Sequence, residues 1–409
     1  MQAPERKSAF VMVGLPARGK SFIARKIARY LSWLGFPTRV FNVGSYRREH
    51  LGDYAGHRFF DPDNAEGVAA RQRLASMALN DMLAWLGAEG RVAIFDATNT
   101  TRARRKWVAD QCKEAGVDVT FIEIIGDDPE TVDANIRATK LRSPDYAGMS
   151  EERQVVDFRA RIAHYERMYE PIDEEHLSYV KLIDGGRQVI VNRMEGYIPA
   201  RVVAYLMNLR PTQRTIWLTR HGESVSNVLG RIGGDAELSE RGSDFAKRLA
   251  EHFRSRRDIE RLVVWTSSLQ RTILTSEPLG APAIAWRALD EIDAGVCDGM
   301  TYEEIRERLP AEFAARQADK LRYRYPGGES YEDIVQRLDP LIAELERRPE
   351  PLLVIAHQAV LRALYCYLIG ETVQRCPFLE IPLHTLIELT PTAYGCDERR
   401  VPLLTISRA

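Results

Sequence analysis

The chain has 409 residues, 45% of them hydrophobic and 28% charged, which is the balance of a globular protein with two or three domains. Lysine and arginine number 57 against 58 aspartates and glutamates, so the net charge gives no general attraction to nucleic acid or to anionic membranes. The five cysteines are odd in number and lack CxxC spacing, which argues against a disulfide framework or a zinc site.

The N-terminal segment is charged and leads directly into the first expected strand, unlike the apolar core of a signal peptide. No apolar run is long enough to cross a membrane. Together with the free-thiol pattern, these features predict a cytoplasmic protein that binds neither membranes nor nucleic acid.

Apolar strands alternate with amphipathic helices along the first half, which is typical of a parallel, doubly wound α/β sheet. The expected strands are 9–14, 38–44, 91–99 and 119–126, followed by a hairpin over 179–193. The expected helices are 21–34, 65–86, a helix running through 107, 130–141, 151–169 and 198–209.

The polar, proline-containing stretch 210–215 predicts a linker, so we divide the chain into domains 1–210 and 211–409. The second half restarts the α/β alternation, which predicts a second α/β domain. Its expected strands are 215–219, 261–268, 352–357, 385–390 and 402–407. One expected helix follows residues 238–242, a second begins at 269 and a third begins at 359. A mostly helical insertion is expected over 301–347.

A phosphate-binding loop joins the first strand to the first helix. The run Gly14-Leu15-Pro16-Ala17-Arg18-Gly19-Lys20-Ser21 fits GxxxxGK[ST], and Phe22 continues into the helix. The glycines let backbone N–H groups surround phosphate oxygens, and the helix N-terminus adds its positive dipole. Lys20 is expected to reach the β- and γ-phosphates of ATP and Ser21 to ligate Mg²⁺. The loop alone does not separate a kinase from a nucleotide-driven motor or switch.

Polar residues at the ends of the next strands favour a kinase. Asp96 follows the third strand, where it can orient Mg²⁺ through water, accept a proton from an attacking hydroxyl or simply cap a turn. Arg47 and Arg48 follow the second strand, and Arg102 and Arg104 follow the third. Several arginines at one sheet edge suggest a second anion beside ATP, such as a small phosphorylated acceptor.

The second half carries a different phosphate chemistry. In the string RHGESVSNVLGRIGGDAELSERG, Arg220 and His221 come directly after a strand. A histidine in this place attacks phosphorus through one ring nitrogen when a backbone acceptor fixes the other. The string resembles the histidine phosphatase and phosphoglycerate mutase superfamily, and three further expected residues are present in order: Arg271, Glu291 and His357.

The two halves in this order resemble one family. The strings GFPTRVFNVGSYRRE, IFDATNTTR, EIDAGVC, YRYPGGESYED and HQAVLR are similar to the bifunctional 6-phosphofructo-2-kinase/fructose-2,6-bisphosphatase family over nearly the whole chain. The resemblance implies a P-loop kinase with a mostly parallel sheet, followed by a phosphoglycerate mutase-like α/β phosphatase. It also implies synthesis of fructose 2,6-bisphosphate from fructose 6-phosphate and MgATP, hydrolysis of that product through phosphohistidine, and a homodimer formed through the kinase half.

The resemblance carries residue roles to the kinase half. The residues expected to bind the sugar phosphate or the transferring phosphoryl group are Arg47, Arg71, Thr98, Arg104, Lys140, Arg161 and Tyr165. Nucleotide binding falls to Asn135, Lys140 and Tyr394 in addition to the phosphate loop, and Mg²⁺ to Ser21 and Asp96. From the sequence alone, Arg71 and Arg161 read as ordinary charges on helix surfaces.

The resemblance likewise assigns the phosphatase half. His221 is the nucleophile, Glu291 protonates the leaving oxygen and then helps to activate water, and Arg220, Arg271 and His357 hold the phosphoryl oxygens. Two further residues are expected to line the same pocket: Asn227 and Gly233. The residues expected to contact the far end of the substrate are Tyr302, Arg316, Lys320, Tyr331, Gln358 and Arg362. The basic, tyrosine-rich insertion is then a clamp for the C6 phosphate, and without the resemblance it reads as an exposed helix and loop.

Two departures from the family pattern bear on activity and control. Gly126 stands where the resemblance implies a cysteine tied to the kinase site, so either that thiol is dispensable or the kinase is weakened. Because phosphoryl transfer rests on positioning and charge, we expect an active kinase. The sequence also lacks the long regulatory tails of some family members, and we expect no control through them.

Two other functions remain open at this point. A polynucleotide end-processing kinase and phosphatase also needs a phosphate loop and a phosphatase, but it predicts a basic groove with stacking aromatics. Alternatively, one half is a catalytically silent binding domain, and Gly126 makes the kinase half the candidate.

Overall fold

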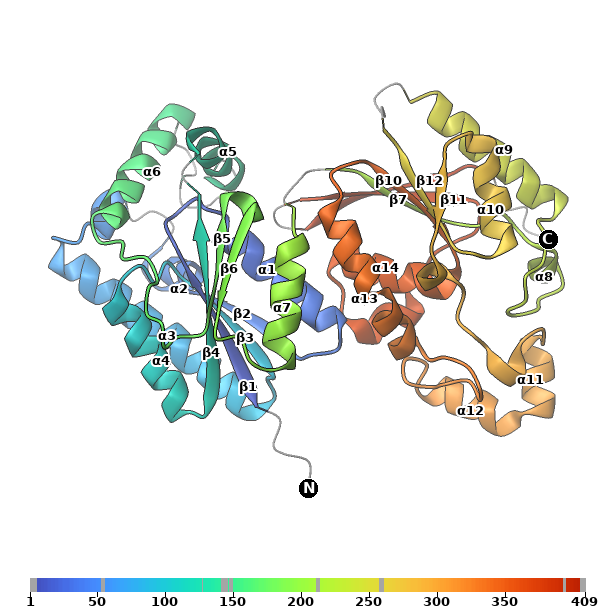
Figure 1. Ribbon diagram of the computed structural model, residues 1–409, viewed down its shortest axis with the longest axis horizontal. Coiled ribbons are helices and arrows are strands. Elements are labelled where there is room, and N and C mark those ends of the chain that lie inside the picture. The colour runs from blue at the N-terminus through green and yellow to red at the C-terminus, as the bar shows by residue number, and fades with distance from the viewer. Residues whose placement is uncertain are drawn as a thin grey trace. The chain divides into compact units, whose positions relative to one another are not determined.

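The computed structural model describes residues 6–52, 56–126, 128–140, 146, 150–210, 214–256, 261–392 and 395–404, without the side chains of 138–140 (Figure 1). The chain forms two compact units, Met1–Pro211 and Thr212–Ala409. Within the described ranges, no helix is both long enough and apolar enough to span a membrane.

Unit 1 is built on a six-stranded sheet in the order β2-β3-β1-β4-β5-β6. The pairs β2–β3, β3–β1, β1–β4 and β4–β5 are parallel, and only the β5–β6 hairpin is antiparallel. The strands are β1 (Lys7–Val13), β2 (Thr38–Asn42), β3 (Val92–Asp96), β4 (Val117–Ile125), β5 (Tyr179–Ile183) and β6 (Gln188–Asn192). The sheet is therefore mostly parallel, as the alternation of strands and helices predicted.

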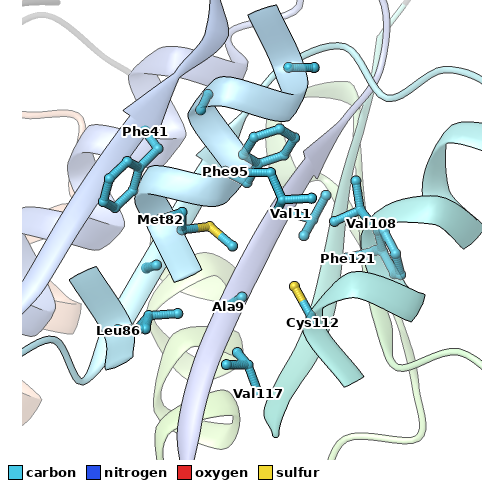
Figure 2. Close-up of a cluster of buried hydrophobic side chains, with 14 of the residues drawn as sticks. Ala9, Val11, Phe41, Met82, Leu86, Phe95, Val108, Cys112, Val117 and Phe121 are labelled. Carbon is cyan, nitrogen blue, oxygen red and sulfur yellow. The ribbon is translucent and has the colours of Figure 1, made fainter. Parts of the chain in front are cut away.

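Helices cover both faces of this sheet (Figure 1). They are α1 (Lys20–Trp33), α2 (Val43–Leu51), α3 (Ala65–Ala88), α4 (Arg102–Glu114), α5 (Pro129–Lys140), α6 (Glu151–Glu166) and α7 (Tyr197–Asn208), with a short 3₁₀ helix η1 (His57–Phe60). On one face, Val11 and Phe95 pack against Met82 of α3 and Val108 of α4 (Figure 2). This core fixes the strands whose carboxyl ends carry the phosphate loop and Asp96.

Unit 2 has a second six-stranded sheet in the order β12-β11-β7-β10-β8-β9. The strands β7, β10, β8 and β9 are parallel to one another, and β11 pairs antiparallel with both β7 and β12. Their bounds are β7 (Ile216–Arg220), β8 (Val263–Thr266), β9 (Ala283–Ala285), β10 (Leu352–Ala356), β11 (Thr385–Pro391) and β12 (Cys396–Pro402). The helices are α8 (Val225–Val228), α9 (Glu240–Arg254), α10 (Gln270–Ser276), α11 (Tyr302–Arg308), α12 (Pro310–Ala318), α13 (Tyr331–Arg347) and α14 (Gln358–Ile369).

The structure changes or extends the bounds of several expected elements. Residues 43–51 form helix α2, whose first turn is capped by Asn42, whereas the sequence predicted a strand as far as 44. The helix expected to run through 107 is α4, which contains Trp107 and continues to Glu114. The last strand in the described part of the chain is the charged segment Cys396–Pro402, whose pairing at the edge of the sheet needs no apolar pattern, and residues 405–407 of the expected strand lie outside the described residues.

Candidate active sites

The phosphate loop of unit 1 turns sharply between β1 and α1. Gly14, Ala17 and Gly19 have positive φ angles of 132°, 60° and 86°. A Cβ atom on Gly14 would lie 2.6 Å from the carbonyl oxygen of Ile124 on the neighbouring strand β4. Glycine is therefore required at this point, and the loop reaches the start of α1 with its backbone free to surround an anion.

Lys20 begins α1 with its side chain turned into the loop. Its side chain is buried, with 8% of the residue exposed, and Nζ donates a hydrogen bond to the carbonyl oxygen of Leu15 at 2.5 Å. Burial lowers the pKa of Lys20 from 10.5 to about 7, against the opposing effect of Asp96. A bound polyphosphate would restore the lysine's positive charge, because a nearby anion favours the ammonium form.

Asn42, at the end of β2, ties the two predicted Mg²⁺ ligands together. Its Nδ2 donates to Oδ2 of Asp96 and lies 3.5 Å from Oγ of Ser21. Its Oδ1 accepts from the backbone N–H of Ser45 at 3.0 Å, which caps α2. One amide thus links the phosphate loop and β3 to the helix that carries Arg47.

Arginines gather around the aromatic residues of η1. The guanidinium carbons of Arg161 and Arg47 lie 3.7 Å and 6.0 Å from the ring centroid of Phe60, and that of Arg71 lies 5.8 Å from the ring of Phe59. Tyr165 packs against Phe60 with the ring centroids 6.0 Å apart. The structure therefore brings together four of the residues predicted to bind a sugar phosphate.

Arg104 extends this group from α4. Its Nη1 donates to Oε1 of Gln72 at 2.7 Å. Burial lowers the pKa of both Arg71 and Arg104, and each is further lowered by a neighbouring arginine, Arg161 and Arg71 respectively. Concentrated, partly buried positive charge of this kind favours a bound anion. In contrast, Arg102 pairs with Asp173 and is half exposed.

The other predicted kinase residues border the loop. The carbonyl oxygen of Thr98 accepts from the N–H of Gly14 at 2.9 Å, and Nδ2 of Asn135 donates to the carbonyl oxygen of Ala17 at 3.0 Å. Arg18 Nη1 donates to the carbonyl oxygen of Pro16 at 3.3 Å, and the ring of Phe22 lies 5.7 Å from Nζ of Lys26. The Lys140 side chain and Tyr394 lie outside the described residues.

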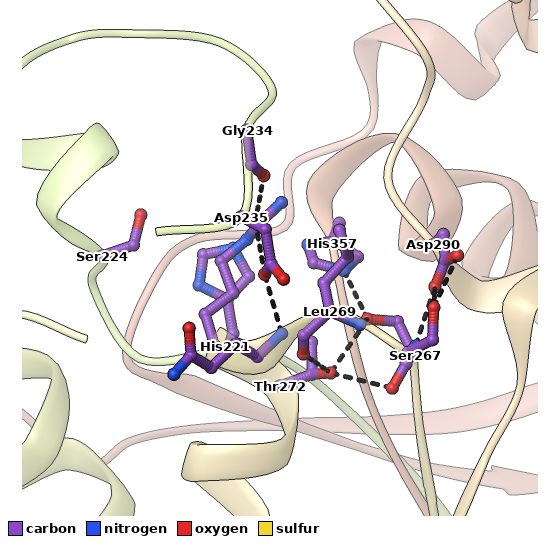
Figure 3. A network of polar contacts seen from close by, with 12 residues as sticks. His221, Ser224, Gly234, Asp235, Ser267, Leu269, Thr272, Asp290 and His357 are labelled. Atoms are coloured by element: carbon purple, nitrogen blue, oxygen red, sulfur yellow. Dashed lines mark hydrogen bonds and ion pairs between the residues drawn. The ribbon is translucent and has the colours of Figure 1, made fainter. Parts of the chain in front are cut away.

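In unit 2, the carboxyl ends of three adjacent parallel strands carry His221 after β7, His357 after β10 and Ser267 after β8 (Figure 3). Nδ1 of His221 lies 2.6 Å from the carbonyl oxygen of Gly222. Because a carbonyl only accepts, Nδ1 carries the proton, and Nε2 of the neutral ring has an unprotonated lone pair. That lone pair accepts from Nε of Arg271 at 3.2 Å.

The environment of His221 keeps its ring neutral. The residue is 3% exposed, and its backbone N–H donates to the carbonyl oxygen of Ala356 at 3.0 Å. Burial, followed by the positive charge of Arg271, holds the pKa of His221 well below 6.5. A neutral imidazole with an unprotonated Nε2 is a nucleophile, so the geometry and the charge state agree.

His357 faces His221, with the ring centroids 5.0 Å apart. It is fully buried, its Nε2 lies 2.7 Å from Oγ of Ser267, and its Nδ1 has no hydrogen-bond partner among the described residues. Burial and the neighbouring His221 hold the pKa of His357 well below 6.5. An orphaned buried nitrogen at this place points to a group that the substrate supplies.

Two arginines and one carboxylate complete the pocket. Nε of Arg220 is buried without a hydrogen-bond partner in the described residues, and burial lowers the pKa of Arg220 to about 10. Arg271 Nη1 donates to the carbonyl oxygen of Gly234 at 2.6 Å. Glu291 Oε1 accepts from the N–H groups of Ile292 and Ala359 at 2.9 Å and 3.3 Å. The charges of both arginines interact with Glu291, so these groups share one pocket.

Two of the predicted pocket residues have structural partners. The Oδ1 of Asn227 accepts from the N–H of Ser224, and the side chain of Ser224 accepts from the N–H of Asn227, which caps the short helix α8. Gly233 has a φ of 71°, and a Cβ there would lie 1.5 Å from Oδ1 of Asp298. A side chain here would be strained and would displace Asp298, so glycine is favoured in the loop that lies beside Arg271.

The predicted clamp forms two arginine–tyrosine groups. Arg316 donates to the hydroxyls of Tyr302 at 3.0 Å and Tyr325 at 2.9 Å, and Arg362 donates to Tyr331 at 3.1 Å. Two further predicted residues have other contacts: Lys320 Nζ donates to the carbonyl oxygen of Pro377 at 2.9 Å, and Gln358 opens α14 directly after His357. Burial, together with Arg362 and Arg316, lowers the pKa of Lys320 to about 8, which indicates clustered positive charge.

Comparison with known proteins identifies both units. A family model described as 6-phosphofructo-2-kinase matches residues 1–213, and a model of the histidine phosphatase superfamily (branch 1) matches residues 216–402. The 6-phosphofructo-2-kinase/fructose-2,6-bisphosphatase of Gallus gallus is 53% identical over 95% of this chain and 83% of that protein. The chain belongs to the 6-phosphofructo-2-kinase/fructose-2,6-bisphosphatase family. Isoform 1 proteins of Rattus norvegicus and Homo sapiens are also 53% identical, over 94% and 96% of this chain and 82% and 84% of theirs.

Gly126 is the position where this chain departs from the pattern that the resemblance implies. A Cβ atom on Gly126 would meet nothing within 4 Å. Crowding therefore does not explain the absence of a side chain at this place. The sequence has a single cysteine between residues 1 and 211, Cys112, which is fully buried and whose thiol pKa burial raises to about 12.

Sequence reasoning missed several residues that hold the two sites in shape. Asn42 links Ser21 and Asp96, and its signal was an asparagine between a strand and a helix. Thr275 Oγ1 accepts from the N–H of Gly222, and His384 Nε2 accepts from the N–H of Glu223 at 3.3 Å, which fixes the loop after His221. His384 lies more than 160 residues along the chain from this loop, so no local pattern could reveal the contact.

Because His221 is buried, we predict that its imidazole titrates below the pH expected for a free histidine. In the chain labelled with ¹⁵N-histidine, we expect the His221 imidazole to stay neutral through pH 6.5 and to protonate only at clearly lower pH, because burial and Arg271 oppose the imidazolium. His221→Gln assigns the signal, and the chain unfolded in denaturant should give a midpoint near 6.5. A folded-state midpoint at or above that of the unfolded chain would contradict the prediction.

Proposed function

We propose that unit 1 transfers the γ-phosphoryl group of ATP to the C2 hydroxyl of fructose 6-phosphate, and that unit 2 hydrolyses the resulting fructose 2,6-bisphosphate. The relatives that are 53% identical over most of their length carry both activities in their names. The observation that carries the proposal is that one chain of this family presents a phosphate loop in one unit and a neutral, buried imidazole nucleophile in the other.

The kinase half acts by positioning and charge. The phosphate loop and Lys20 would hold the β- and γ-phosphates, while Arg47, Arg71, Arg104 and Arg161 would hold the sugar phosphate. The C2 hydroxyl is anomeric and therefore more acidic than an ordinary alcohol, so no strong general base is needed. Cationic groups around the transferring phosphoryl then supply most of the stabilisation.

The residues around Asn42 fit a magnesium ion. Ser21 Oγ and Asp96 Oδ2 both lie within reach of the single Nδ2 of Asn42, so a hydroxyl and a carboxylate oxygen are close together. Mg²⁺ prefers oxygen ligands and usually takes one or two from the protein and the rest from phosphates and water. When bound, the ion would neutralise charge on the ATP phosphates, and Asn42 would keep its two protein ligands in place.

The phosphatase half would act in two steps. Nε2 of His221 attacks the C2 phosphorus and the P–O bond to C2 breaks, while Glu291 gives its proton to the departing C2 oxygen. Arg220, Arg271 and His357 hold the phosphoryl oxygens. Water, deprotonated by Glu291, then attacks phosphorus, and the P–N bond breaks to release phosphate and the neutral imidazole.

Arg271 has a second part in this scheme. In the free pocket its Nε donates to the lone pair of His221 Nε2, so the nucleophile is capped by a donor. An incoming phosphoryl group offers the guanidinium several anionic oxygens, which are better acceptors than a neutral imidazole nitrogen. Substrate binding would therefore draw Arg271 away and free the attacking lone pair.

We also propose that the chain works as a cytoplasmic homodimer, on the family resemblance and the free-thiol pattern described above. Light scattering on the purified chain tests the dimer. The balanced charge supports a small phosphorylated substrate over a polynucleotide, and electrophoretic shift with short oligonucleotides tests that choice.

The two activities should be separable by single substitutions. We expect Lys20→Met to abolish the formation of fructose 2,6-bisphosphate and to leave its hydrolysis intact, because only the phosphate loop loses its cation. His221→Ala should do the reverse and should also eliminate acid-labile phosphate from the protein. Both rates are measured with ATP, Mg²⁺ and fructose 6-phosphate. A wild-type chain that forms no bisphosphate would overturn the kinase half of the proposal, and hydrolysis that survives in His221→Ala would overturn the other half.

Asn42→Asp should slow the kinase by about tenfold, since one hydrogen bond is lost and a second carboxylate is placed beside Asp96. Two close carboxylates raise the pKa of one of them, so the acid limb of the kinase pH profile should move to higher pH. Asn42→Ser keeps the cap of α2 and adds no charge, so it should slow the kinase without moving the pH profile. Bisphosphate hydrolysis by the same chain is the control. Wild-type kinase kinetics in Asn42→Asp would contradict the assigned role.

The kinase should resist thiol reagents. Because Cys112 is buried and its thiol pKa is about 12, we expect N-ethylmaleimide to leave the kinase rate unchanged. Gly126→Cys should be active before treatment, because its side chain meets open space, and should lose activity on alkylation. Equal rates of inactivation in the two proteins would show that another thiol controls the kinase.

A further inference from the structure

Two buried hydroxyls lie behind His357, on the side away from His221. Ser267 follows β8 and Thr272 lies in α10, and both are completely buried, as is His357. Oγ of Ser267 lies 2.7 Å from Nε2 of His357 and 2.8 Å from Oγ1 of Thr272 (Figure 3). The phosphatase mechanism above uses neither hydroxyl, although in the described part of the chain Ser267 makes the only hydrogen bond to the imidazole of His357 and Thr272 contacts Ser267 in turn.

The hydrogen bonds of Ser267 limit where its proton can go. A hydroxyl has one proton to donate and two lone pairs that accept. One lone pair of Ser267 accepts from the N–H of Leu269 at 3.1 Å. The contacts to Thr272 and His357 must therefore share the proton and the remaining lone pair, and only two arrangements satisfy both.

In the first arrangement, Ser267 accepts from the Thr272 hydroxyl and donates to Nε2 of His357, so the imidazole proton is on Nδ1. In the second, Nε2–H of His357 donates to Ser267, which donates to Thr272, whose proton goes to the carbonyl oxygen of Leu269 at 2.9 Å. The two arrangements leave opposite nitrogens of His357 protonated. The direction in which the two hydroxyls donate is therefore coupled to the tautomer of His357.

The orphaned nitrogen of His357 distinguishes the two arrangements. Nδ1 is buried and has no partner among the described residues, and the ring faces His221. A phosphoryl group on His221 offers only acceptor oxygens, so an unprotonated Nδ1 would repel it. With the proton on Nδ1, a neutral His357 donates to the phosphoryl group without first taking up a proton, which its buried position opposes.

We propose that Ser267 and Thr272 are positioning residues for the phosphatase: Thr272 and the Leu269 N–H orient the Ser267 hydroxyl toward Nε2, and this holds His357 as the neutral tautomer protonated on Nδ1. The consequence for hydrolysis rests on the function proposed above. The tautomer itself does not, because it can be observed in the free protein.

Nuclear magnetic resonance of the full chain tests the tautomer. The chain has eight histidines, so ¹⁵N-histidine labelling gives few signals, and His357→Gln identifies the pair from His357. At neutral pH without ligand, we expect a protonated, pyrrole-type Nδ1 and a pyridine-type Nε2 that is shifted by its hydrogen bond. A protonated Nε2 in the free protein would overturn the proposal, whatever the activity of the enzyme.

Substitutions test whether the hydroxyls act through His357. Ser267→Ala should move the Nε2 signal toward that of a nitrogen without a hydrogen bond and lower kcat for hydrolysis about tenfold. Thr272→Val, which has the same shape, should lower kcat less, and Thr272→Ser should restore it. The kinase rate of the same chain reports on folding. Unchanged signals and kcat in Ser267→Ala would overturn the positioning role, whereas a wild-type chain without hydrolysis would overturn only the proposed function.

Discussion

The parallel pairing of β7, β10 and β8 is the constraint on which the phosphatase pocket depends. Parallel strands bring their carboxyl ends to one edge of the sheet, so residues 221, 267 and 357, which are far apart in the chain, become neighbours there. The pairing of β2, β3, β1 and β4 does the same for the kinase. A shift of register in either sheet would separate the side chains of a site while leaving each strand intact.

Both sites bury positive charge that the protein itself only partly compensates. Burial lowers the pKa of Lys20 to about 7 and of Arg220 to about 10, and Nε of Arg220 has no partner among the described residues. Such groups destabilise the empty site, and an anionic substrate relieves that penalty when it binds. In the proposed mechanisms, the same charges would then stabilise a phosphoryl group during transfer.

The sequence predicted the parts of the fold and sites that depend on local pattern. The phosphate loop, Asp96 and His221 each adjoin an apolar strand, and the order of strands and helices placed them at strand ends. Helix α2 was missed because Val43 and Gly44 continue the run of the preceding expected strand, and β12 was missed because a charged edge strand lacks an apolar pattern. Asn42, Ser267 and His384 were missed because their roles arise from contacts across the sheet, for which no local signal exists. The roles of individual site residues stay predictions.

The two sites handle a basic side chain in opposite ways, which suits their opposite reactions. In the proposed kinase, Lys20, whose pKa is lowered by burial, would gain full positive charge when phosphates bind, and it would form no covalent bond. Burial favours the neutral form of His221, the Gly222 carbonyl accepts a hydrogen bond from one ring nitrogen, and in the proposed phosphatase the other ring nitrogen would bond to phosphorus. Transfer from ATP starts with a good leaving group and needs charge stabilisation, whereas hydrolysis of a sugar phosphate needs a nucleophile stronger than water. Burial lowers the pKa of both groups, and the position of each donor and acceptor decides which chemistry follows.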